Sequence, residues 1–135
     1  MRILLVLMGL TLLYSCNNNA SSFVASYEQT KTKLEEKETT EPFQFLSVNG
    51  RYWKNWIGQW VCEGNITNMA SVASYKDVVL KVVYYSKTNS ELGSEEKTVF
   101  EYFKPNSSQH FKIKVNDIEG TSFIKVAVLS ASSGQ

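Results

Sequence analysis

The sequence is poor in the residues that most often carry catalysis and metal binding. Its 135 residues include two cysteines and one histidine, too few for a structural zinc site of the usual four-ligand kind. The only aspartates are Asp77 and Asp117, and neither has the Asp-x-Asp spacing of a calcium loop. We find no phosphate-binding loop and no nucleophile motif. The composition therefore predicts a protein without enzymatic activity, metal or cofactor.

The charge of the chain is almost balanced, which argues against a large class of partners. Fourteen lysines and arginines stand against 13 aspartates and glutamates, for a formal net charge of +1 at pH 7. A protein with so little net charge does not attract nucleic acid or anionic membranes by long-range electrostatics. We expect no nucleic-acid partner, and the length allows one domain.

Residues 1–15 have the pattern of a secretory signal. Arg2 supplies a positive charge, and the apolar run from Ile3 to Leu13 is too short to span a bilayer. We expect this segment to be removed from the mature protein.

The signal ends in Leu13-Tyr14-Ser15-Cys16, with leucine three positions before the cysteine and a small residue directly before it. This resembles the bacterial lipobox, although Tyr14 is bulkier than usual. The resemblance implies that the Cys16 thiol receives diacylglycerol, that the chain is cut before Cys16, and that the new amino terminus is acylated, typically with palmitate. More than one acyl chain is needed for stable anchoring, because a protein with a single acyl chain binds membranes only marginally. An ordinary secretory signal with an incidental cysteine is the alternative.

Asn17 follows the cysteine, in place of the aspartate that retains some lipoproteins in the inner membrane. The resemblance to lipoproteins therefore implies the outer membrane, with either leaflet open.

Residues 16–42 are expected to form the lipidated cysteine and a flexible tether. The segment is polar, and such a composition buries too little apolar area to offset the entropy of ordering the chain. We expect its glutamates, Glu38 among them, to be solvated and the segment to contribute almost nothing to folding. A flexible chain of this length reaches on the order of 30 Å. A short helix over residues 26–38 is the alternative, although it lacks an apolar stripe.

The stretch Tyr75–Tyr85 is the strongest strand signal in the chain. It is rich in Val and Tyr, which suit a pleated and buried surface, and contains neither Gly nor Pro. Alternation places four side chains on one face: Val78, Leu80, Val82 and Tyr84. The other face is also largely apolar, which predicts a central strand packed on both sides. A buried helix is the alternative, because short apolar runs are ambiguous.

Further strands are expected around this one, at residues 43–48, 51–53, 59–67, 98–103, 110–116 and 122–129. The first two form a hairpin, because Asn49-Gly50 readily adopts the positive φ angles of a type I′ turn. Residues 53–58 stay open between strand and helix. The domain spans residues 43–131, with 132–135 frayed. Short strands separated by turns, without an amphipathic helix, predict an all-β sandwich or barrel.

Three segments carry a resemblance to a known family. Gly64-Asn65-Ile66-Thr67-Asn68 closes one strand, Tyr75-Lys76-Asp77-Val78 opens the Val-rich strand, and Phe103-Lys104-Pro105 ends a later one. From Trp60 to Ala131 this order resembles the FxLYD-type, immunoglobulin-like domains of bacterial envelope proteins, with a departure at Ser86 and Lys87. The resemblance implies an immunoglobulin-like β-sandwich of about seven strands and carries over no catalytic residue. With the lipobox, the chain resembles small lipoproteins of the Bacteroidetes type.

Four aromatic side chains crowd within nine residues: Tyr52, Trp53, Trp56 and Trp60. Such rings stack on sugars or anchor a protein partner. A small sandwich cannot bury all of them on one face, so we take Tyr52, Trp53 and Trp56 as candidate binding residues. The alternative is that the rings fill the core.

Two other reactive side chains receive simpler interpretations. Cys62 stands on an apolar strand face, where a thiol usually serves as a small buried hydrophobe. His110 stands on the polar side of its strand, where we expect solvent exposure and no catalytic role.

These observations predict a non-catalytic, lipid-anchored protein of the cell envelope, held to the membrane through Cys16, whose β-sandwich binds a protein or glycan partner. The alternative is a lipocalin-like carrier of a small ligand, since Asn49-Gly50-x-x-Trp53 resembles the lipocalin entrance. Seven strands are one short of that fold. An internal apolar cavity would favour the carrier, and a filled core with external aromatic residues would favour the interaction module.

Overall fold

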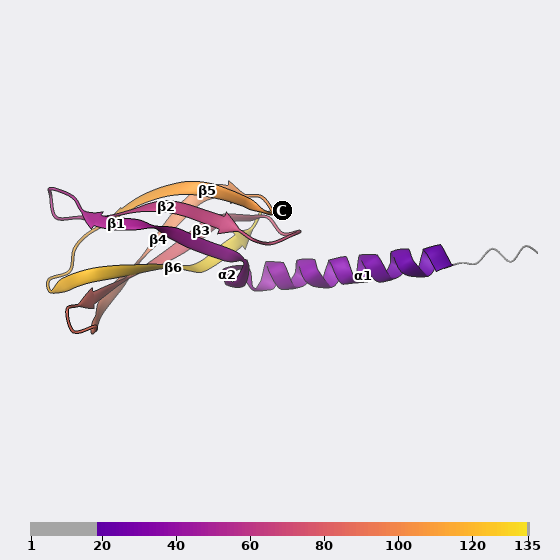
Figure 1. Ribbon diagram of the computed structural model, residues 1–135, viewed down its shortest axis with the longest axis horizontal. Helices are drawn as coiled ribbons and strands as arrows, with labels where there is room; N and C mark the ends of the chain where they lie inside the picture. Colours follow the sequence, from indigo (N-terminus) through magenta and orange to yellow (C-terminus); the bar gives the residue numbers. More distant parts are fainter. Residues whose placement is uncertain (1–18, 135) are drawn as a thin grey trace, which may run out of the picture.

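The computed structural model describes the backbone of residues 19–134 and the side chains of residues 22–134, so the signal segment and Cys16 lie outside the described residues. Two helices precede six strands: α1 (Asn19–Thr40), α2 (Pro42–Phe45), β1 (Leu46–Lys54), β2 (Trp60–Asn68), β3 (Tyr75–Ser86), β4 (Glu91–Phe103), β5 (Ser107–Val115) and β6 (Thr121–Ser133). Figure 1 shows the strands as one elongated body with α1 projecting from one end.

The strands form two antiparallel sheets that pack face to face. One sheet has the order β1-β2-β5 and the other β4-β3-β6. The fifth strand lies beside the second and the sixth beside the third, which is the pairing found in immunoglobulin-like sandwiches. The prediction of an all-β sandwich is confirmed, with six strands in the described residues where about seven were expected.

The structure has one strand fewer than predicted because the first two predicted strands are a single strand, β1. Residues 43–48 and 51–53 do not form a hairpin, because β1 continues through Asn49-Gly50 without a turn. Gly50 pairs with Gly64 of β2, and a Cβ atom on either glycine would collide with the backbone of the opposite strand. The two glycines therefore allow close strand approach and do not make the predicted turn.

The turn between β1 and β2 lies a few residues later, in the stretch that the sequence left open. The Oδ1 atom of Asn55 accepts hydrogen bonds from the backbone N–H groups of Ile57 at 3.2 Å and Gln59 at 2.8 Å. Gly58 has a φ of 82°, which glycine adopts without steric cost. Asn55 and Gly58 thus fix the shape of the turn.

The core follows the alternation predicted for the central strand. Val78, Leu80, Val82 and Tyr84 of β3 are each at most 1% exposed, and β3 lies between β4 and β6. The prediction of packing on both sides was wrong, because among the described residues no further layer covers the outer face of this sheet. Tyr85 on that face is half-buried and stacks on Phe123 of β6, with ring centroids 5.1 Å apart.

The C-terminal residues are more ordered than expected. Residues 132 and 133 belong to β6 and pair with the start of β3, so the predicted fraying at residue 132 is wrong. The N–H of Gly134 donates to the carbonyl oxygen of Ser74 at 2.8 Å and extends this pairing.

The predicted flexible tether is a helix in the structure. α1 contains 22 residues and is roughly 33 Å long. Its Glu, Lys, Gln and Ala residues are good helix formers, and together they outweigh the lack of a strong apolar face. The helix also exceeds the shorter alternative over residues 26–38. Neither helix of the described part of the chain has the length and apolar content that crossing a bilayer requires.

The central position of Val82 gives a test of the core. Val82→Ala should lower the free energy of unfolding by about 1–3 kcal/mol, through lost burial and a small cavity. Val82→Asp places an unpaired charge in the core and should prevent stable folding at neutral pH. Chemical denaturation followed by circular dichroism measures both, with Val83→Ala on the half-buried outer face as the milder control. A Val82→Asp variant that melts like the wild type would contradict this assignment.

Candidate interaction surfaces

The four crowded aromatic residues have different environments in the structure. Trp60 opens β2 and is 7% exposed, and its Nε1–H donates to Oδ1 of Asp117 at 2.7 Å. Tyr52 is partly exposed and meets the Trp60 ring edge-on, with centroids 6.2 Å apart. Trp56 is 95% exposed, and Trp53 is half-buried. The structure therefore places Trp60 in the core and leaves the three candidate residues Tyr52, Trp53 and Trp56 accessible.

The turn between β1 and β2 presents two large apolar side chains to solvent. Trp56 and its neighbour Ile57, which is 56% exposed, lie in this turn. The turn lies at the end of the sandwich opposite to α1 (Figure 1). Because Asn55 and Gly58 fix its backbone, little conformational freedom is lost when a partner binds there. We call Trp56 and Ile57 the turn pair.

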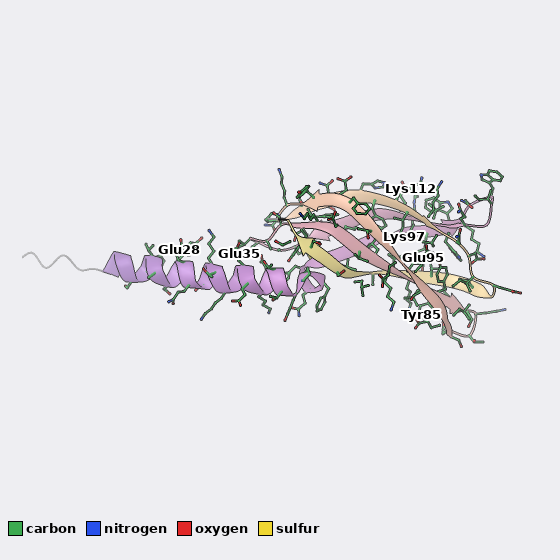
Figure 2. All side chains as sticks on the ribbon, turned by 180° about the vertical axis from the view of Figure 1, so that it is seen from behind. Glu28, Glu35, Tyr85, Glu95, Lys97 and Lys112 are labelled. Atoms are coloured by element: carbon green, nitrogen blue, oxygen red, sulfur yellow. The ribbon has the colours of Figure 1, made fainter. Side chains whose placement is uncertain are left out.

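A second surface covers the outer face of the β1-β2-β5 sheet. Cζ of Arg51 lies 5.4 Å and Nζ of Lys112 lies 5.9 Å from a ring centroid of Trp53, both within cation–π range. Figure 2 shows Lys112 on the opposite side of the sandwich from Tyr85. We call Arg51, Trp53 and Lys112, together with Glu63 and His110, the Trp53 face.

The charges of the Trp53 face are only partly compensated. The Glu63 carboxylate lies 3.3 Å from Nε2 of His110, 3.9 Å from Nζ of Lys112 and 4.0 Å from Nη2 of Arg51. These contacts are largely exposed and contribute little to stability. One carboxylate shared among cationic groups around an indole ring leaves a surface suited to an acidic or hydroxyl-rich partner.

Cys62 is buried, as predicted, and its thiol is unreactive because it stays protonated. It is 2% exposed, and burial raises the pKa of its thiol to about 11. Cys62 pairs with Ile113 and His110 pairs with Asn65, so Cys62 and His110 point to opposite faces of the sheet. They do not form a nucleophile–base pair. His110 is exposed, as the sequence predicted.

A small cavity of about 160 Å³ lies beside Cys62. It is lined mainly by Val48, Tyr52, Phe111 and Val126, next to Gly50. Pockets that hold small ligands usually measure about 300–1,000 Å³. The small volume and the two-sheet fold argue against the lipocalin-like carrier. Among the described side chains, no group of three or more His, Cys, Asp or Glu residues could hold a metal ion.

The site that joins α1 to the sandwich was not predicted from the sequence. Glu38 was expected to be solvated, but it is 1% exposed. Its Oε1 accepts hydrogen bonds from the N–H and the hydroxyl of Ser71, both at 2.9 Å, and its Oε2 accepts from the N–H groups of Val72 at 2.9 Å and Ala73 at 2.8 Å. Successive backbone N–H groups of this kind form a concave anion-binding nest. The tether is therefore docked on the domain.

The hydroxyl of Tyr75 adds a further contact by donating to the backbone carbonyl of Glu38 at 2.5 Å. The Asn68 side chain supports the nest from behind. Its Nδ2 donates to the carbonyls of Ala73 at 2.9 Å and Phe103 at 3.0 Å, and its Oδ1 accepts from the N–H of Ala70 at 2.9 Å. We call the contacts of Glu38 with residues 71–75 the Glu38 clamp.

The electrostatics of the clamp favour the charged carboxylate. Burial acts to raise the pKa of Glu38, but the donors of Ser71, Ala73 and Val72 outweigh it and hold the pKa below its ordinary value of 4.5. Burial, together with the nearby Glu38 charge, raises the pKa of the Tyr75 hydroxyl to about 12, so it stays a donor. No local sequence signal distinguishes Glu38 from Glu36, because its partners lie more than 30 positions away.

The clamp predicts a pH-dependent contribution to stability. Glu38→Gln turns a donor toward the nest and should lower the free energy of unfolding by about 1.5–3 kcal/mol at pH 7, whereas the exposed Glu36→Gln should have almost no effect. Because the folded pKa of Glu38 is depressed, its contribution is complete above pH 4.5 and disappears as the pH falls through the lower folded value. Melting curves of wild type and Glu38→Gln should therefore converge at acid pH. A constant difference down to pH 2 would contradict this account.

Comparison with known proteins gives one distant similarity. No family model matches the chain, and no curated protein matches it in sequence. Among solved structures, the chain is similar to the trimeric lipoprotein SadB of Salmonella enterica, with 8% sequence identity, a TM-score of 0.45, and coverage of 82% of this chain and 75% of that chain. A similarity this distant assigns neither a family nor a function.

Proposed function

We propose that this protein is a non-catalytic lipoprotein of the cell envelope, anchored through Cys16 in the outer membrane, whose β-sandwich binds a protein or glycan partner. The observation that carries the proposal is Trp56, which is 95% exposed in a fixed turn at the end of the sandwich opposite to α1. A tryptophan displayed in this way has no packing role in the domain and suits the pocket of a partner.

The anchor is supported by the order of segments along the chain. The lipobox-like Leu13-Tyr14-Ser15-Cys16 follows an apolar signal, and α1 begins three positions after Cys16. The helix therefore stands between the acylated residue and the sandwich. The resemblance of residues 60–131 to FxLYD-type domains of bacterial envelope proteins supports the same arrangement.

The geometry separates the turn pair from the start of α1 by a long distance. α1 is roughly 33 Å long, and β1, with nine residues, adds about 30 Å along the sandwich. Since the clamp joins the helix to the body, Trp56 is presented on the order of 60 Å from the first residue of α1. Such a position suits contact with a cell-wall glycan or with a protein held away from the membrane.

The Trp53 face supplies a second contact region with a different chemistry. Its cations and indole ring suit carboxylate-bearing sugars or acidic peptide segments, whereas the turn pair suits an apolar pocket. One partner can contact both regions, because only Lys54 and Asn55 separate Trp53 from the turn pair.

The turn pair gives the first test of this function. Trp56→Ala combined with Ile57→Ala should weaken partner capture at least about 30-fold, the loss expected for a tryptophan hot spot of 2 kcal/mol or more. The readouts are sedimentation with purified peptidoglycan and photo-crosslinking in the native host from position 57. Phe100→Ala removes another exposed aromatic ring, 78% exposed on β4, and should change nothing. Full capture by the turn-pair variant and by Trp53→Ala would refute the proposed surfaces.

The anchor gives a separate test. Cys16→Ser should abolish acylation and leave the precursor uncleaved, because the lipid acceptor thiol is gone. Phase partitioning in detergent and intact-protein mass spectrometry report both effects. Cys62→Ala removes the other cysteine and should keep the lipid. Normal cleavage and detergent partitioning of Cys16→Ser would exclude the lipoprotein assignment.

A further inference from the structure

The amino-terminal part of α1 carries large apolar side chains that the sandwich does not cover. Phe23 is 75% exposed, Val24 57% and Tyr27 61%. Their spacing places them along one side of the helix, and Glu38, fifteen positions after Phe23, lies on the same side. The side of α1 that contacts the sandwich at Glu38 is therefore apolar and exposed to solvent in the amino-terminal part, where the helix extends beyond the sandwich. Figure 2 shows this extension, with Glu28 on it.

The charge distribution along the same segment is uneven. Residues 17–27 contain no charged side chain, whereas residues 28–41 contain eight: Glu28, Lys31, Lys33, Glu35, Glu36, Lys37, Glu38 and Glu41. The uncharged half is the half next to Cys16. A segment that only separated the anchor from the domain would have no reason to keep charge away from one end and place aromatic rings there.

We propose that residues 19–27 of α1 lie in the lipid–water interface, where Phe23, Val24 and Tyr27 contact the boundary between headgroups and acyl chains. The proposal rests on the proposed acylation of Cys16, which holds the start of α1 at the membrane surface. Phe23 is seven positions after Cys16 and four after Asn19, the first residue of α1, which is about 6 Å along the helix. Interfacial helices bury their apolar face by about 5–10 Å, and aromatic residues are enriched at that depth.

A second copy of the chain would be the other occupant of this apolar side, but the sequence of α1 does not favour it. A helix–helix seam needs apolar residues at the a and d positions over at least three or four heptads. After Tyr27, the same side of α1 continues with Thr30, Lys31 and Leu34, so it offers one further apolar position. The concentration of apolar residues next to the anchor fits a lipid surface better than a continuous seam.

The test uses the full acylated protein in vesicles of phosphatidylethanolamine and phosphatidylglycerol, with and without lipids brominated near the headgroup end of their chains. Phe23→Trp places a fluorescent reporter at the proposed contact. Trp53, Trp56 and Trp60 remain in the sandwich and give a constant background. Leu34→Trp is the matched control, on the same side of α1 but about 16 Å further along the helix. Mass spectrometry first confirms the acyl chains on each variant, so that a failure of the anchor is recognised separately.

The proposal expects blue-shifted emission from Phe23→Trp and its quenching by brominated lipid, with Leu34→Trp unquenched. An acylated Phe23→Trp protein with unquenched, water-like emission would overturn it. Blue-shifted emission without quenching, accompanied by crosslinked multimers, would overturn it in favour of a second copy. Should Phe23→Trp fail to fold, Tyr27→Trp provides the same readout one turn later.

Discussion

A buried carboxylate held by backbone N–H groups determines how this molecule is assembled. Glu38 would be costly in an apolar environment, yet four hydrogen-bond donors of residues 71–73 compensate for its lost hydration. The nest depends on the conformation of residues 69–74, which the Asn68 side chain fixes. Tyr75, the first residue of the central strand β3, bonds directly to the backbone of the helix at Glu38. The orientation of α1 is thus set by the same residues that connect the two sheets.

The parts of the fold that could be predicted are those in which a sequence pattern repeats over several residues. Val78, Leu80, Val82 and Tyr84 alternate over several residues, and the core face of β3 followed from that period. Asn49-Gly50 gave a single local signal that serves equally well for a tight turn or for close strand approach. Only its pairing with Gly64, fourteen positions away, distinguishes the two. Glu38 is the extreme case, since its distinction from Glu36 lies wholly in a distant loop.

The candidate binding residues show the same limit. Trp56 and Trp60 are four positions apart, and the sequence offered both the core and the surface for such rings. The turn formed by Asn55 and Gly58 falls between β1 and β2, leaving Trp56 in solvent, while Trp60 enters β2 and bonds to Asp117. Crowding alone predicted that at least one of the four rings is exposed, because a small sandwich has too little interior for four large rings, but it did not show which one. The cations around Trp53 come from two strands and could not be assembled from sequence.

Because α1 is a continuous helix with one fixed end, its length has an angular consequence as well as a linear one. Each residue of an α-helix adds about 1.5 Å of rise and about 100° of rotation. A chain segment that behaved as a coil would leave its side chains free to turn about the sandwich. Here the fifteen positions between Phe23 and Glu38 fix the angle between the exposed apolar side of α1 and the two sheets. One residue more or fewer between them would rotate that apolar side by about 100° relative to the sandwich.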